Sequence, residues 1–350
     1  MSDLSTKKRD FSIDLIKSLA IIGVILIHVS VQAYAYPLAS FSWLSGLFWG
    51  TISRAAVPLF LMASGALMLD PKRDLSLKKL YTKNFLRLLV ALFFWAFSYK
   101  VFHSLAYSTL TFPKLLTYAK EVLLFNHEFH LYYLHIMLLV YVFLPLTRLF
   151  VKHASLKEYR YALLVWFVLG ILSSTLKSLW PFNLISGVPL TWILSSSYGA
   201  IGYTLLGYYI KSLCKTKKWI YMILVFLGAI TIFTGTLLAS LKIGKLSQTF
   251  FDGFALAVFL LATGIFGWVM KSKSDFGKKT NKVITYLSKA SFCIYLVHLF
   301  FMYMFTKIGF TVESFIPFLS IPIYTLITLG LSILTYFVLS KIPLVNKWLI

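Results

Sequence analysis

The chain consists of long runs of apolar residues that alternate with short polar segments. Ten of these runs have about 20 residues, the length that an α-helix needs to cross the hydrocarbon core of a membrane. We therefore expect an all-α membrane protein whose ten transmembrane helices form a bundle around a central cavity. The predicted spans are residues 13–33, 43–69, 88–109, 130–150, 159–177, 191–210, 219–241, 251–270, 286–306 and 317–339.

The overall composition agrees with this pattern. Hydrophobic residues make up 59% of the chain and charged residues 13%, and the mean hydropathy is +0.82. A soluble domain is less apolar, so lipid must be the second solvent. We expect a cytoplasmic tail at residues 1–9 and a single membrane domain over residues 10–350. Residues 110–128 are amphipathic and are expected to lie on the membrane surface or to fold back into it.

Basic residues between the spans predict the orientation of the chain. With the N-terminus in the cytoplasm, 25 of the 34 Lys and Arg residues fall in or beside cytoplasmic segments and 7 fall outside. The other two, Lys17 and Arg54, lie in spans. This asymmetry follows the positive-inside rule and predicts a multi-pass protein of the cell membrane with both termini in the cytoplasm. The net charge of +23 thus comes from membrane loops and does not indicate a nucleic-acid partner.

The first span carries three ionisable residues, Asp14, Lys17 and His28. Such residues are costly inside a membrane and usually face a functional cavity. His28 follows Lys17 by eleven positions, which places the two within about 20° of each other and about 16 Å apart along a helix. Asp14 shares this face. A structural alternative is that Lys17 extends to the headgroups while His28 completes an internal hydrogen bond.

The second span contains Arg54, some eleven residues from its outer end. An arginine at that depth needs a partner or a water-filled cavity. A purely structural role is the alternative, in which Arg54 bonds the backbone carbonyls that Pro58 leaves free.

More polar residues stand near the outer ends of other spans. Three histidines between residues 127 and 135 invite a metal interpretation, but no other ligand set converges with them, and we expect no metal. They could also mark only the edge of an aromatic belt. We expect an outer cavity formed by His28, Arg54, Glu128, His130, Asp252 and His298. We expect its cytoplasmic mouth to be cationic and to be formed by Lys17, Lys83 and Arg87.

Four patches, the last of them made of two segments, resemble motifs of the acyltransferase-3 family of integral membrane acyltransferases, especially its stand-alone O-acetyltransferases of surface polysaccharides. Lys17 followed by His28 is similar to the family's Arg-x10-His. Residues 54–65, RAAVPLFLMASG, resemble R-x-x-V-P-L-F-F-x-x-S-G and are the most specific match. Residues 81–88, YTKNFLRL, correspond to a segment with R-x-x-R that is implicated in donor binding. Residues 130–133, HLYY, and 291–298, SFCIYLVH, resemble H-L-W-F and S-x-x-I-Y-L-x-H.

The chain departs from the family pattern at two positions. Lys17 stands where the family usually has arginine, so the charge is kept but the bidentate geometry is not. Asn84 replaces the first arginine of R-x-x-R, while Arg87 matches the second. We expect Lys83 to substitute for the missing cation.

The resemblance implies transfer of an acyl group, most simply acetyl, from cytoplasmic acyl-CoA to a hydroxyl of an extracytoplasmic or lipid-linked cell-surface saccharide. His28 is expected to be the general base, oriented by Glu128. Arg54 or protonated His298 would stabilise the oxyanion. A covalent acyl-histidine is an open alternative. Lys17, Lys83 and Arg87 would bind the CoA phosphates, and the substrate site would include His130, Tyr295 and Asp252.

Two functions of other classes compete with this hypothesis. A glycan or lipid-glycan transporter would also place His and Arg in the membrane, but we find none of the inverted repeats that many transporters show. A structural scaffold explains neither the buried charges nor the order of the motifs. A homo-oligomer is compatible with the sequence.

Overall fold

The computed structural model describes residues 9–272 and 276–350, and every regular element within them is a helix. The predicted all-α fold is therefore confirmed. The elements η2 and η4 are π-helical, and the other η elements are 3₁₀ helices. In chain order the elements are α1 (Phe11–Val31), η1 (Gln32–Ala35), α2 (Phe41–Ser53), α3 (Ala56–Met68), α4 (Leu77–Lys79), η2 (Leu80–Phe85), α5 (Leu86–Tyr107), α6 (Phe112–Leu123), η3 (Phe129–Leu131), α7 (Tyr132–His153), α8 (Leu156–Trp166), η4 (Phe167–Leu172), α9 (Ser173–Leu176), η5 (Phe182–Leu184), η6 (Val188–Trp192), α10 (Ser196–Ser212), α11 (Lys218–Ile243), α12 (Leu256–Lys271), α13 (Lys278–Lys307), α14 (Pro317–Leu339) and α15 (Pro343–Trp348).

Eight helical segments of the described residues could each span a membrane. They are long and apolar enough to cross a membrane: Phe11–Ala35, Phe41–Met68, Leu77–Tyr107, Phe129–His153, Leu156–Leu176, Lys218–Ile243, Lys278–Lys307 and Pro317–Leu339. The other two predicted spans fall on shorter helices, α10 with 17 residues and α12 with 16. Each of the ten predicted spans thus lies on a helix.

The sixth and eighth predicted spans start several residues before the helices on which they lie. The span expected from residue 191 begins at Ser196, because the apolar residues before it form the separate 3₁₀ helix η6. The span expected from residue 251 begins at Leu256. There the Asp252 N–H donates to the Gln248 carbonyl and the Asp252 carboxylate accepts from Phe254 N, so the chain turns before the helix starts.

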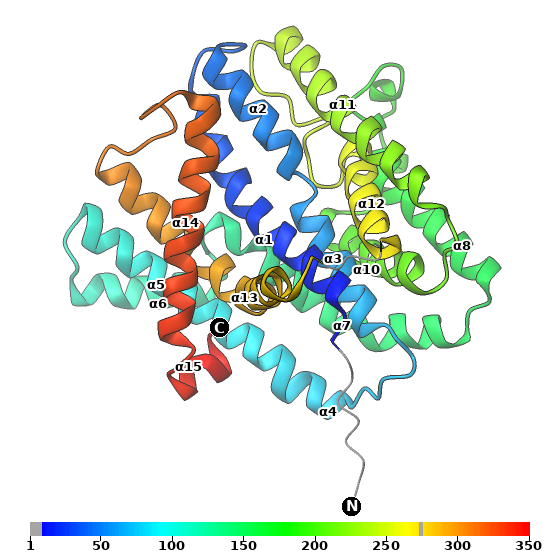
Figure 1. Ribbon diagram of the computed structural model, residues 1–350, viewed down its shortest axis with the longest axis horizontal. Helices are drawn as coiled ribbons and strands as arrows, with labels where there is room; N and C mark the ends of the chain where they lie inside the picture. The colour runs from blue at the N-terminus through cyan, green and yellow to red at the C-terminus, as the bar shows by residue number, and fades with distance from the viewer. Residues whose placement is uncertain (1–8, 273–275) are drawn as a thin grey trace, which may run out of the picture.

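The helices alternate in direction between two ends of the bundle (Figure 1). At one end, which we call the terminal end, α1 begins close to where α10 finishes, and Lys211 pairs with Asp10 at 2.6 Å. Four hydrogen bonds to backbone carbonyls lie at the same end: Ser18 to Ile284, Arg87 to Ile350, Arg148 to Met68 and Lys271 to Cys214. The opposite end is closed by contacts such as that of Ser42 with Glu313 at 2.6 Å.

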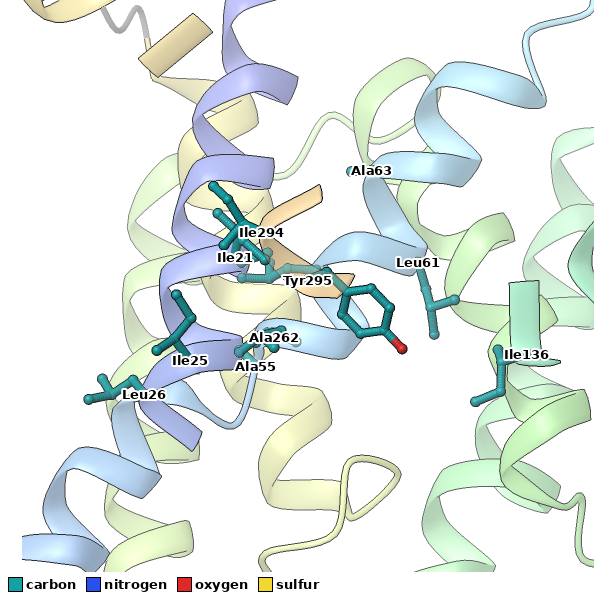
Figure 2. Close-up of a cluster of buried hydrophobic side chains, with 14 of the residues drawn as sticks. Ile21, Ile25, Leu26, Ala55, Leu61, Ala63, Ile136, Ala262, Ile294 and Tyr295 are labelled. Carbon is teal, nitrogen blue, oxygen red and sulfur yellow. The ribbon is translucent and has the colours of Figure 1, made fainter. Parts of the chain in front are cut away.

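The first helix is the centre of the bundle. It packs against α2, α3, α12, α13 and α14. Figure 2 shows Ile21 and Ile25 of α1 next to Ile294 of α13, all of them fully buried. The two helices run in the same direction, because α1 contacts Ser288 near its start and His298 near its end. The polar residues of α1 are thus held against α13.

Two glycines allow α3 and α10 to cross at backbone contact. A Cβ on Gly65 would lie 1.9 Å from the Thr204 carbonyl oxygen, and one on Gly207 would lie 2.1 Å from that of Met62. Any side chain at these positions would separate the helices. The Ser-Gly pair that ends the second family motif therefore has a packing role at its glycine.

Candidate active site

The second membrane segment is broken at Arg54. The helix α2 ends at Ser53 and α3 begins at Ala56, so Arg54 lies in the turn between them. Pro58 falls in the first turn of α3. Backbone N–H groups there have no intrahelical acceptor, so a proline costs the helix no hydrogen bond. The Arg54 guanidinium lies 3.5 Å from the ring centre of Phe251 and beside Tyr34. The break thus points a cation into the bundle instead of along a helix surface.

Three histidines from distant parts of the chain meet in the bundle. The rings of His28 on α1 and His298 on α13 stack with their centres 5.2 Å apart. His130 of η3 approaches His298 edge-on at 5.6 Å. Arg54 acts electrostatically on His28. The structure therefore brings together four of the predicted site residues, from all but one of the matched motifs.

Hydrogen bonding leaves much of this cluster available to a ligand. His298 Nδ1 donates to the Tyr295 carbonyl at 2.8 Å, which leaves Nε2 as the atom that can accept a proton. Within the described residues, His298 Nε2, both ring nitrogens of His130 and Arg54 Nε are buried without a partner. Unsatisfied buried polar atoms are costly. Such atoms on three residues of this cluster indicate a site for a polar ligand.

A cavity of about 280 Å³ extends from the terminal end toward this cluster. Its wall combines residues of four family motifs: Lys17 from α1, Ser64 from α3, Arg87 from α5 and Ser291 from α13. Tyr295 lines the cavity and also lies beside His130 and His298, at 5.8 and 6.3 Å between ring centres. The Tyr295 hydroxyl donates to the His130 carbonyl at 2.5 Å. This tyrosine is the point where the cavity and the histidine cluster meet.

The charges around the cavity mouth are partly satisfied by the protein. Lys17 Nζ donates to the Ser288 carbonyl at 3.1 Å, and Ser288 Oγ donates to Asp14 at 2.7 Å. The predicted common face of Asp14, Lys17 and His28 is thus confirmed, because all three contact α13. Arg87 donates to the main-chain oxygen of Ile350.

Lys83, which we expected to replace a family arginine, is exposed and does not line the cavity, whereas Asn84 does.

Glu128 has other neighbours than those we expected. Its carboxylate lies 3.2 Å from His103 Nε2 and accepts from the Tyr303 hydroxyl, also at 3.2 Å. Among the described residues, no hydrogen bond or ion pair joins Glu128 to His28. The other two histidines of this region pair with each other, with His127 Nδ1 lying 3.1 Å from His135 Nε2. In the described part of the chain no group of three or more His, Cys, Asp or Glu is placed to hold a metal ion.

Asp252 lies at a second cavity, at the opposite end of the bundle. This cavity has about 560 Å³ and is lined by the chain between α9 and α10 and by the chain between α11 and α12. Asp252 acts electrostatically on Arg54 and on Tyr132. Arg54 in turn neighbours His28. The histidine cluster thus meets the first cavity through Tyr295, and Arg54 lies against Phe251, the sequence neighbour of Asp252 in the lining of the second cavity.

A family model described as an acyltransferase domain matches residues 10–337. The chain belongs to the acyltransferase-3 family. It is accordingly a membrane acyltransferase with several membrane-spanning helices. Searches of curated proteins and of solved structures found no match. The family assignment therefore rests on almost the whole chain, but it does not name a donor or an acceptor.

Several residues that shape the site had no signal in the sequence. Tyr99 of α5 donates to the Leu296 carbonyl at 2.7 Å and contacts the His130 ring at 4.9 Å. The ring of Phe251 makes a cation–π contact with the Arg54 guanidinium. Both residues are aromatic positions in or beside apolar runs. Only the long-range packing distinguishes them from ordinary core residues.

Proposed function

We propose that this acyltransferase-3 protein transfers an acetyl group from cytoplasmic acyl-CoA to a hydroxyl of a saccharide on the extracytoplasmic side of the cell membrane. The observation that supports this most is the position of the histidine cluster, which meets one cavity through Tyr295 and lies near Arg54, whose ring contact Phe251 precedes Asp252 of the other cavity. A donor and an acceptor from opposite sides of a membrane could meet there. The terminal end would face the cytoplasm, as the basic loops predict.

In the proposed reaction the acceptor oxygen attacks the thioester carbonyl carbon. His28 takes the hydroxyl proton as the new C–O bond forms. Collapse of the tetrahedral intermediate breaks the C–S bond, and the proton passes from imidazole to the departing CoA thiolate. The products are the O-acetyl saccharide and free CoA. Arg54, or His298 once its Nε2 carries a proton, would stabilise the oxyanion in a site with few competing partners.

The donor would enter by the cavity at the terminal end. Lys17 and Arg87 line that cavity and would bind CoA phosphates, with Lys83 on the exposed surface nearby. The arm of the cofactor must then span roughly the 16 Å of helix rise between Lys17 and His28. Tyr295, which lies on that route and fixes the His130 backbone, would guide the acetyl end. Glu128 would act on the site through Tyr303 and the neighbouring Tyr99.

Replacement of His28 tests the proposal directly. The full-length protein in proteoliposomes is supplied with labelled acetyl-CoA on the terminal side and with an envelope saccharide fraction on the other. Because a positioned base contributes at least about a hundredfold, His28→Ala should reduce acetyl transfer by that factor. His153→Ala, an exposed histidine at the end of α7, is the matched control and should retain transfer. Unchanged transfer in His28→Ala would contradict the mechanism, and saccharide movement without acetylation would favour a transporter.

A further inference from the structure

The cavity at the opposite end of the bundle has an unusual lining. Its floor is rich in hydroxyl and amide groups, including Ser174, Ser247, Gln248 and Thr249. These groups offer both donors and acceptors, which is the chemistry that a polyhydroxyl ligand requires. The floor is held in place because Thr175 Oγ1 accepts from Leu256 N at 2.8 Å, tying α9 to α12. This part of the cavity suits a sugar ring and not an acyl chain.

The rim of the same cavity is apolar and unprotected. It is formed by residues 180–193, whose members Leu190 and Ile193 reach into the cavity lining. Along this segment Trp180 is 79% exposed, Leu184 70%, Val188 66% and Trp192 61%. Tryptophans at such positions are typical of the interface between membrane and water. An apolar chain in the membrane could therefore lie along this rim while its polar end occupies the floor.

The lining of this cavity also includes a cation. Lys177 lines the cavity directly after α9, and its ammonium group has no ion pair among the described residues. Among the described residues, Asp252 is the only carboxylate in the lining and Lys177 the only cation, on a largely neutral surface. A lysine in this place matches a phosphate group on a ligand.

We propose that this cavity binds the acceptor as a lipid-linked saccharide, in which a phosphate joins the sugar to a long apolar chain. The sugar would contact the hydroxyl-lined floor, Lys177 would bind the phosphate, and residues 180–193 would contact the apolar chain. The proposal rests on the acyl transfer proposed above and names the class of its acceptor. A free polysaccharide would use the floor but would leave both Lys177 and the apolar rim without a ligand.

The test compares the same sugars with and without their lipid. A lipid-linked saccharide fraction is extracted from membranes of cells that produce the protein, and half of it is treated with mild acid, which releases the sugar from the lipid phosphate. Both halves are offered at equal sugar concentration to the full-length protein with labelled acetyl-CoA. The KM for the lipid-linked form should be lower by about tenfold or more, as one charge-assisted contact can provide.

Two variants probe the proposed contacts separately. Lys177→Gln should raise the KM for the lipid-linked acceptor about tenfold and bring it near that of the released sugar. Trp192→Ser should raise the same KM through the loss of apolar contact. The matched controls are Lys120→Gln on α6, at the same end of the bundle, and Trp219→Ser at the start of α11, and both should keep the KM of the unmodified protein.

The outcomes distinguish this inference from the proposed function. Equal KM values for the two acceptor forms, or for Lys177→Gln and the unmodified protein, would overturn the lipid-linked acceptor and leave acyl transfer intact. If Trp192→Ser alone has no effect, residues 180–193 make only ordinary contacts with the bilayer and the proposed rim is wrong. Acetylation of neither form would overturn the proposed function together with this inference.

Discussion

Arg87 makes two kinds of contact, and a single substitution would remove both. It lines the cavity at the terminal end, and it donates to the main-chain oxygen of Ile350. If it binds a CoA phosphate, Arg87→Ala should weaken acetyl-CoA binding about tenfold or more, because a charge-assisted hydrogen bond is lost. Equilibrium binding of labelled acetyl-CoA to the purified protein measures this change.

A second variant separates phosphate binding from docking of the C-terminal segment. Trp95 Nε1 donates to the Leu349 carbonyl at 2.9 Å, so Trp95→Phe loosens the same segment without removing a cation. It should leave acetyl-CoA affinity nearly unchanged, as should Arg160→Ala at the same end of the bundle. Equal losses in Arg87→Ala and Trp95→Phe would show that Arg87 acts by docking and not by binding phosphate.

At the scale of elements, the crossing of α3 and α10 depends on the absence of side chains. Gly65→Ala would place a Cβ 1.9 Å from the Thr204 carbonyl oxygen, which backbone atoms cannot relieve by rotation. Such overpacking typically costs about 1–3 kcal/mol, so the thermal unfolding midpoint in detergent should fall by several degrees. Gly330→Ala on α14 is the control, because a Cβ there meets nothing within 4 Å. A midpoint for Gly65→Ala equal to that of the control would contradict this account of the crossing.

The elements also show how far the sequence can predict this molecule. Hydropathy located the ten helices, because lipid contact imposes an apolar composition on each span separately. It could not locate the break at Arg54, since α2 and α3 together form one apolar run. Nor could it show which side chain of residues 83–84 faces the cavity. The π-helix η2 turns its residues at a different angle from an α-helix, and Asn84 instead of Lys83 reaches the cavity.

The sequence could predict which residues lie together in the site only where helical phase and family motifs agreed. Lys17 and His28 share a face by spacing alone, and the structure places both against α13. Glu128 had no such constraint, and its partners His103 and Tyr303 come from helices 25 and 175 residues away. The position of a loop carboxylate depends on which helices pack beside it. Long-range packing therefore decides which predicted residues form the site.

At the scale of the whole molecule, the orientation in the membrane assigns each cavity to a substrate. In a background with Cys214 and Cys293 replaced by serine, single cysteines are introduced at Lys72 and Lys157 of the terminal end and at Lys120 and Lys245 of the opposite end, all of them exposed. A membrane-impermeant maleimide should label the second pair in intact spheroplasts and the first pair only after permeabilisation, because the basic loops stay in the cytoplasm. The reverse pattern would open the cavity with Lys17 and Arg87 to the outside, where acyl-CoA is not supplied. It would contradict the predicted topology and the proposed direction of transfer in one measurement, while the family and the helical fold would stand.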